Sequence, residues 1–133
     1  MAIGQNSNLK SQNQNSKVKT GLKERCYKYT ISVIKFLVNL PEKRSQQIIS
    51  NQLMRSSTSV GANVIEAKSA SSKRDFVRYY EIALKSANET TYCLGLLKDA
   101  LNVQGLEIEG LIRETGELSK ILAASLLTMK NKT

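Results

Sequence analysis

Between Phe76 and Leu101, small or apolar residues recur at alternating intervals of four and three positions. Because an α-helix has 3.6 residues per turn, this spacing places them along one side of a helix of about seven turns. Stripes of this kind form the seams along which helices pack in bundles. The stripe consists of Phe76, Tyr80, Ala83, Ala87, Thr90, Leu94, Leu97 and Leu101. It predicts a long bundle helix, and no alternating strand pattern competes with it elsewhere in the chain.

Two helices are predicted before this stripe. The first runs from about Leu22 to Leu40 and stops at Pro41, because proline lacks a backbone N–H donor and disfavours a helical residue before it. Its seam is expected to contain Cys26, Thr30, Val33, Leu37 and Leu40. The second covers about residues 43–70. There Gly61 interrupts the helix interior at a cost of about 1 kcal/mol relative to alanine, which indicates a close approach by another helix.

The ends of the remaining helices are also marked. Ser72 begins the helix that carries the heptad stripe, and Asp75 follows three residues later, as in a capping box. A turn at 102–105 precedes a last helix over about residues 107–130. Four helices with short connections predict an all-α, antiparallel up-down-up-down four-helix bundle. We assign residues 21–133 to this bundle domain and residues 1–20, which are polar and low in complexity, to a disordered basic tail.

The first and third helices carry more apolar surface than one seam requires. The surplus consists of Tyr27, Ile31, Ile34 and Val38 on the first helix and of Ile82, Cys93 and Leu96 on the third. Because extra apolar surface of this kind usually contacts another subunit, we expect a homo-oligomer.

Several classes of function are disfavoured by residues that the chain lacks. It contains no histidine, which removes the usual general base and the commonest metal ligand. Cys26 and Cys93 lie far apart, and we interpret both as small core residues rather than redox or metal-binding groups. No apolar run approaches the roughly 20 residues that span a bilayer, and the N-terminal segment has no signal-peptide pattern. We expect a cytoplasmic protein without a cofactor or metal and without a membrane partner.

A catalytic site is not predicted either. The hydroxyls at 56–59 have no histidine to activate them. Asn63, Glu66 and Glu89 lie near apolar stripes, and a buried network that joins them to Arg55 explains them more simply than catalysis, because a buried charge must be paired. An enzyme is the better interpretation only if a ligand binds in a polar pocket near Asn63 and Glu66. We therefore expect a protein that is not an enzyme.

The charge of the chain is distributed unevenly. The formal net charge is +9 at pH 7; residues up to Arg78 carry +10 and the remainder −1. In an antiparallel bundle, the start of the first helix, the turn between the second and third, and the end of the fourth meet at one end. That end is expected to hold the carboxylates Glu24, Glu66 and Asp75 and the cations Lys17, Lys19, Lys23, Arg25, Lys28, Lys68, Lys73, Arg74, Arg78, Lys130 and Lys132. The opposite end is expected to be close to neutral.

This basic end predicts a surface that attracts phosphates. Lys73 and Arg74 occupy the first turn of a helix, where the helix dipole penalises cations by roughly 0.3–1 kcal/mol, so stability alone does not explain them. Aromatic rings for stacking are expected nearby from Tyr27, Tyr29 and Tyr79. The nucleic-acid contacts are predicted to be Lys68, Lys73, Arg74 and Arg78, helped by Lys23, Arg25 and Lys28. The alternative is an ordinary solvated charged face, since no helix-turn-helix, zinc-finger or RNP pattern is present.

Part of the chain has a more specific pattern. It comprises Gln52–Ala67, with the core Arg-Ser-x-x-Ser-x-x-x-Asn-x-x-Glu, followed by Ser72–Phe76, Ile82–Lys85 and Asn88–Tyr92. In this pattern the chain resembles, over about residues 22–130, the bacterial four-helix-bundle proteins encoded by intervening sequences of 23S rRNA genes. These are distant structural relatives of the accessory variability determinant of diversity-generating retroelements. The chain departs from the family pattern at Cys93, where tryptophan is usual, and at Ser86, where glutamate is frequent.

The resemblance implies a homopentamer arranged as a barrel, without enzymatic activity. The retroelement relative binds nucleic acid and a reverse transcriptase. The resemblance also implies structural or interface roles for Arg55, Ser59, Asn63, Glu66, Asp75, Phe76 and Glu89. Five copies in one orientation would join their basic ends into a ring that attracts polyanions.

Two hypotheses about function follow. The first is an oligomeric, non-enzymatic protein that binds RNA, or an RNA–DNA intermediate, through its basic end, as an accessory to a reverse transcriptase or in association with rRNA. The second is an adaptor that binds another protein, such as a polymerase, and has no direct contact with nucleic acid.

Overall fold

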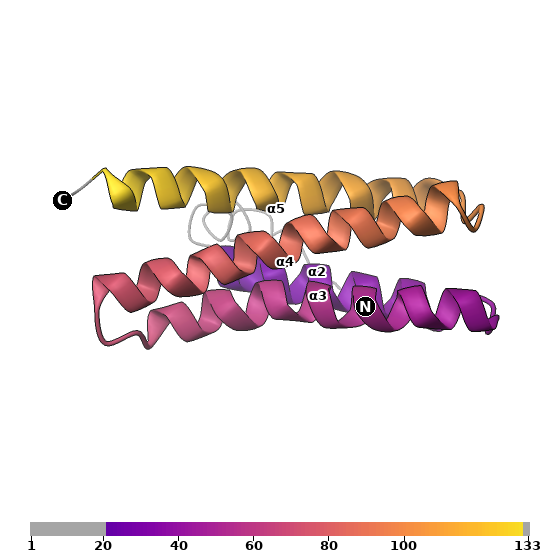
Figure 1. Ribbon diagram of the computed structural model, residues 1–133, viewed down its shortest axis with the longest axis horizontal. Coiled ribbons are helices and arrows are strands. Elements are labelled where there is room, and N and C mark those ends of the chain that lie inside the picture. The colour runs from indigo at the N-terminus through magenta and orange to yellow at the C-terminus, as the bar shows by residue number, and fades with distance from the viewer. Residues whose placement is uncertain (1–20, 132–133) are drawn as a thin grey trace, which may run out of the picture.

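The computed structural model describes residues 21–131 of the 133-residue chain. Over these residues it consists of four helices and contains no strand: α2 (Leu22–Val38), α3 (Arg44–Lys68), α4 (Lys73–Asp99) and α5 (Leu106–Lys130) (Figure 1). Each begins and ends within a few residues of the bounds that periodicity predicts. The predicted disordered tail, residues 1–20, and the cations Lys17, Lys19 and Lys132 lie outside the described residues.

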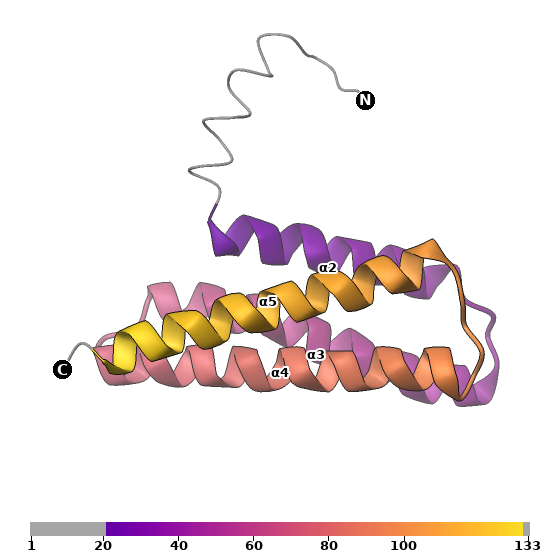
Figure 2. The ribbon, with the colours of Figure 1, turned by 90° about the horizontal axis from the view of Figure 1, so that it is seen from above.

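The helices form an antiparallel bundle in which each packs against two neighbours. The contacting pairs are α2 with α3, α3 with α4, α4 with α5, and α2 with α5. The backbones of the diagonal pairs in this described bundle, α2 with α4 and α3 with α5, lie farther apart, with no Cα atoms within 8 Å of each other. Figures 1 and 2 show successive helices running in opposite directions, with the α3–α4 turn at one end and the α2–α3 and α4–α5 connections at the other. The predicted up-down-up-down architecture is confirmed.

Local signals in the sequence explain where the helices begin. The Ser72 hydroxyl caps α4 by accepting a hydrogen bond of 3.1 Å from the Asp75 backbone N–H, as the capping pattern predicts. Gly105 precedes α5 with φ of +126°, a conformation that side chains disfavour and glycine tolerates. Residues at the connections therefore determine where α4 and α5 begin.

The core follows the heptad stripe on α4 and departs from the predicted seam on α2. Ala83, Ala87, Thr90, Leu94 and Leu97 are buried, whereas the ends of the stripe are half-buried. Of the predicted seam of the first helix, Cys26 and Val33 are buried, whereas Thr30, Leu37 and Leu40 are half-buried. Tyr29 and Phe36, which the seam did not include, are buried as well. Because α2 is apolar on nearly every side, periodicity alone did not identify the face that the largest side chains would bury.

Hydroxyl groups connect the helices inside this core. The Tyr29 hydroxyl on α2 lies 2.6 Å from Thr115 Oγ1 on α5. The Thr90 hydroxyl on α4 donates to Ser56 Oγ on α3 at 2.8 Å. These four residues are at least nine-tenths buried, and each hydroxyl has a hydrogen-bond partner. Burying them therefore avoids the free-energy penalty of an unpaired polar group.

Gly61 allows the close packing that its position in the sequence predicts. A Cβ at this residue would lie 3.2 Å from the Cβ of Cys26 on α2, a shorter separation than ordinary van der Waals contact. The backbones of α2 and α3 therefore approach each other here because the glycine has no side chain.

We expect Gly61→Val to lower the free energy of unfolding by about 1–3 kcal/mol, because the added methyl groups would push α2 away from α3. The matched control is Gly95→Ala on α4, where a Cβ meets no atom within 4 Å. That change is expected to raise the free energy of unfolding by up to about 1 kcal/mol through helix propensity alone. Urea denaturation followed by circular dichroism measures both. Equal stability of the valine variant and the native chain would show that the α2–α3 contact is looser than described.

Candidate nucleic-acid interface

One end of the bundle gathers basic side chains from three helices. The end of α3, the start of α4 and the end of α5 meet there, as Figures 1 and 2 show at the end where the chain terminates. The basic pole is the set of exposed cations at this end: Lys68, Lys73, Arg74, Arg78 and Lys130. The antiparallel fold thus brings together all four of the principal predicted contacts, which come from two helices, and adds Lys130 from a third.

A hollow of about 780 Å³ opens at the basic pole. Its lining is Ser72, Lys73, Arg74, Asp75, Val77, Arg78, Glu81, Met129 and Lys130. Both carboxylates in it have a partner on the protein: Lys130 Nζ lies 2.8 Å from Glu81 Oε2, and the Ser71 hydroxyl donates to Asp75 at 3.2 Å. Four cations against two carboxylates leave this cationic hollow with a net positive charge.

The first turn of α4 adds to the positive potential of the cationic hollow. Backbone N–H groups at a helix N-terminus carry partial positive charge, and the Ser72 cap satisfies the N–H group of Asp75. Lys73 and Arg74 therefore add full charges where the helix dipole is already unfavourable for them. An anion bound beside this turn relieves that repulsion, which is the arrangement that phosphate sites at helix N-termini use.

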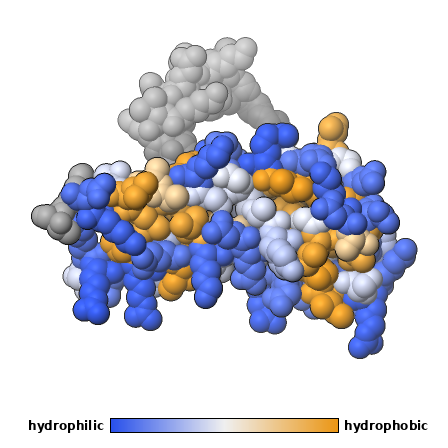
Figure 3. Space-filling view, turned by 45° about the horizontal axis from the view of Figure 1, so that its top comes forward, coloured by the Kyte–Doolittle hydropathy of each residue, from blue (hydrophilic) through white to orange (hydrophobic). Residues whose placement is uncertain are grey.

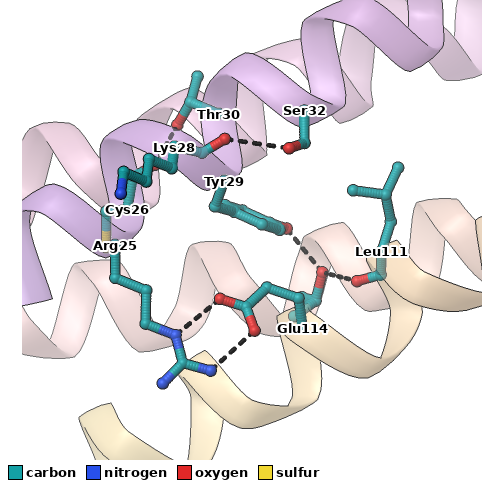
Figure 4. A network of polar contacts seen from close by, with 9 residues as sticks. Arg25, Cys26, Lys28, Tyr29, Thr30, Ser32, Leu111 and Glu114 are labelled. Atoms are coloured by element: carbon teal, nitrogen blue, oxygen red, sulfur yellow. Dashed lines mark hydrogen bonds and ion pairs between the residues drawn. The ribbon is translucent and has the colours of Figure 1, made fainter. Parts of the chain in front are cut away.

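The start of α2 does not reach the basic pole. Arg25 forms a bidentate ion pair with Glu114 of α5, with both N···O distances 2.7 Å (Figure 4). Glu114 precedes Lys130 by sixteen residues, which is about 24 Å along a helix. The prediction of a single basic end that includes Lys23, Arg25 and Lys28 is therefore wrong. Its physical reason is length: α2 has 17 residues, whereas α3, α4 and α5 have 25, 27 and 25, so α2 begins set back from that end (Figure 2).

Arg25 and Lys28 line a separate hollow of about 520 Å³ between α2 and α5. Glu107 and Glu114 also line it, so cations and carboxylates are mixed there. The hydrogen bonds that Arg25 donates to Glu114 raise the pKa of Arg25, as expected for a cation held by a carboxylate. Because Arg25 is already paired, this hollow is a weaker candidate for binding phosphates than the basic pole.

The predicted stacking role of Tyr29 is also wrong. Only 3% of this residue is exposed, and its hydroxyl is hydrogen-bonded to Thr115 within the core (Figure 4). Burial raises the pKa of Tyr29 to about 12. Tyr27 is 67% exposed but lies on α2, away from the cationic hollow, and Tyr79 is half-buried. The aromatic pair at the basic pole is instead Phe76 and Tyr80, whose ring centroids lie 4.8 Å apart.

The charged residues of the family-like pattern do not form the predicted buried network. Arg55, Glu66 and Glu89 are exposed. Asn63 donates to the Ser59 carbonyl at 2.8 Å and to its Oγ at 3.0 Å, and Ser59 Oγ lies 2.8 Å from Ser86 Oγ on α4. The small polar residues thus join α3 to α4, whereas the charged residues lie just outside that seam and remain solvated.

Sequence reasoning missed Glu114 and the Phe76–Tyr80 pair as parts of the surface. Arg25 and Glu114 are 89 positions apart, so their pairing depends on the register between α2 and α5, for which the sequence contains no local signal. In the sequence, Phe76 and Tyr80 are two residues of the heptad stripe, and that pattern predicts only that they lie in a packing seam. Its position near the basic pole follows from the fold.

In residues 21–131, no group of three or more histidine, cysteine, aspartate or glutamate side chains is arranged to hold a metal ion. None of the four helices described is long and apolar enough to cross a membrane.

Comparisons with known proteins agree on one family. The family model described as 23S rRNA-intervening sequence protein matches residues 19–124. A crystal structure of a protein of unknown function from the S23 ribosomal protein family of Bacteroides thetaiotaomicron is 31% identical in sequence. The match covers 80% of this chain and 98% of that chain, with a TM-score of 0.74. No curated protein matches the chain.

Proposed function

Since the chain belongs to the 23S rRNA-intervening sequence protein family, we propose that it is a non-enzymatic helical bundle that binds RNA through its basic pole. The nucleic acid is rRNA or an RNA–DNA intermediate. Binding to rRNA would take place in the cytoplasm. The observation that carries this proposal is the cationic hollow, in which lysines and arginines from α4 and α5 surround the first turn of a helix. Cations clustered in this way bind phosphates and release the counterions around a nucleic acid.

We also propose that the protein works as a homo-oligomer, with five subunits as the resemblance implies. Four apolar residues on the outer side of α2 support an interface: Tyr27, Ile31, Ile34 and Val38 are between 37% and 73% exposed. Their spacing of four, three and four is that of a helix packing seam, although the opposite side of α2 already packs in the core. Subunits with a common orientation would place their basic poles in one ring and bind polyanions more strongly than a single pole does.

Charge reversal at the basic pole tests the RNA-binding proposal. We expect Lys73→Glu with Arg74→Glu to abolish retention of a labelled 23S rRNA fragment at moderate salt and to leave the oligomer intact. Log affinity decreases linearly with log salt concentration, and we expect the magnitude of this slope to decrease by about two, one for each lost phosphate contact. Filter binding over a series of salt concentrations measures both effects.

The chain offers a matched control for this experiment. Lys43 and Arg44 also begin a helix, α3, and lie at the opposite end of the bundle. Lys43→Glu with Arg44→Glu changes the net charge by the same amount and is expected to retain most of the RNA affinity. If the two double variants lose affinity equally, only overall charge matters and the basic pole is not a binding site.

The second candidate is an adaptor that binds another protein, a reverse transcriptase among others. The exposed stripe on α2 favours it, because apolar surface of this kind serves a foreign partner as well as a second copy. This function is the better one if neither double variant changes RNA retention and the native chain is a monomer.

A further inference from the structure

A third hollow, of about 550 Å³, lies between α4 and α5 beside the basic pole. Phe76 and Tyr80 of α4 and Ile121, Ala124, Thr128 and Met129 of α5 line it, and none of its lining residues is charged. Figure 3 shows apolar surface near the end of the bundle where the chain terminates, interrupted and surrounded by hydrophilic side chains. We call the hollow between α4 and α5 the aromatic groove; its uncharged lining lies beside the charged lining of the cationic hollow.

The short α2 explains why no helix of the described chain covers the aromatic groove. Thr115 contacts Tyr29 of α2, but the groove residues of α5 begin at Ile121 and continue toward the basic pole. Because α2 begins set back from that end, the last turns of α5 pack against α4 without a helix on their other side (Figure 2).

The aromatic groove and the cationic hollow are adjacent. Met129 lines both, and Phe76 lies between Asp75 and Val77, which line the cationic hollow. The rings of Phe76 and Tyr80 stack on each other with an interplanar angle of 23°, so a base can join them by adding to the end of this stack. A flat apolar site next to a cationic one has the chemistry of a nucleotide, which joins an apolar base to an anionic phosphate.

Resting on the RNA-binding function proposed above, we infer that the basic pole binds unpaired nucleotides of a single-stranded nucleic acid, with a phosphate in the cationic hollow and a base in the aromatic groove. A base inside a duplex is stacked and paired, so its face is not accessible to Phe76 or Tyr80. A single strand exposes base faces, and aromatic side chains bind them with little dependence on sequence. The site therefore selects single strands over duplexes.

Phe76→Leu tests the inference because it keeps an apolar side chain of similar size and removes the aromatic face. We expect the affinity for a single-stranded RNA of about twelve nucleotides to fall about tenfold, the usual order for losing one stacked base. The affinity for the blunt duplex of the same sequence should not change. Phe76→Tyr is expected to retain binding, and 2-aminopurine placed in the single strand should lose fluorescence on binding the native chain but not the leucine variant.

Tyr92→Leu is the matched control, since Tyr92 is a 68% exposed aromatic residue on α4 that lines neither hollow. The inference is overturned if the native chain binds single strands and duplexes alike and Phe76→Leu changes neither, while reversal of Lys73 and Arg74 abolishes both. In that case the RNA-binding proposal stands. A change of oligomeric mass in Phe76→Leu, with RNA affinity per subunit unchanged, also overturns it, because the groove then belongs to a subunit interface. Failure of the native chain to bind either RNA overturns both proposals.

Discussion

Raising the pH from 9 to 12 is expected to lower the free energy of unfolding by about 5 kcal/mol and to unfold the bundle. The largest contributions come from two acidic groups buried in the core, the Cys26 thiol and the Tyr29 hydroxyl, at residues only 1% and 3% exposed. Burial also raises the pKa of Cys93 and of Tyr80. Burial raises the pKa of Cys26 from 9.0 to about 11 and that of Tyr29 from 10.0 to about 12. A pKa raised by about two corresponds to about 2.7 kcal/mol of free energy of unfolding for each group.

The sign of the effect follows from where the proton is bound more tightly. Both groups hold their proton more strongly in the folded chain than in the unfolded one, so their stabilising effect is complete below pH 9. It is lost as the pH rises through 9–11 for Cys26 and 10–12 for Tyr29. With no histidine in the chain, stability is expected to vary little between pH 6 and 8.

Circular dichroism at 222 nm during an alkaline titration measures this transition. Cys26→Ala and Tyr29→Phe each remove one titrating group and are expected to make the stability less dependent on pH, although each variant is less stable at pH 7. Tyr27→Phe is the control, because Tyr27 lies on the same helix and is exposed. An unchanged pH dependence in both core variants would mean that other groups cause alkaline unfolding.

The second large effect concerns assembly. We expect Ile31→Glu with Ile34→Glu to convert the oligomer into a monomer of 14.8 kDa while the helix content remains unchanged. These residues occupy the centre of the outer stripe on α2 and are 37% and 38% exposed, so part of each side chain reaches solvent in a single bundle. Two carboxylates in an apolar interface would lose their hydration without gaining partners, which disfavours association strongly. Light scattering coupled to gel filtration measures the mass.

Leu106→Glu is the matched control for assembly. Leu106 is 92% exposed and begins α5, so it tests whether any new charge on an exposed apolar residue dissociates the subunits. If the native chain is an oligomer and the α2 variant keeps its mass, the subunits meet through another surface. If the native chain is itself a monomer, the oligomer proposal is wrong.

The fold was predictable because its signals are local. The 3.6-residue periodicity marks the four helices, Ser72 with Asp75 marks the start of α4, and the short connections force antiparallel neighbours. Gly61 was identified as a contact because glycine in a helix interior has a cost that tight packing explains. All these inferences need only residues within a few turns of each other.

The site was less predictable because it depends on register and on helix length. The four principal predicted contacts, from Lys68 to Arg78, lie close in sequence across one turn, so the fold brings them together whatever the register. Arg25 depends on how far α2 extends along α5, and the pairing with Glu114 follows only once that offset is known. Charged residues such as Arg55 and Glu66 lie beside an apolar stripe in sequence but project to solvent in the bundle.

The hydroxyl pairs inside the core have a consequence for how this chain tolerates genetic change. Sliding one helix along its neighbour by a single turn would separate Ser56 from Thr90 and Tyr29 from Thr115. Ser56, Thr90 and Thr115 would keep their bonds to carbonyls of their own helices, whereas the buried Tyr29 hydroxyl would lose Thr115. The hydrogen bonds between helices therefore favour one register of α3 against α4 and of α2 against α5. Loss of the Thr115 hydroxyl would leave the buried Tyr29 hydroxyl without this partner, so lineages descended from this gene would be expected to replace these two residues together.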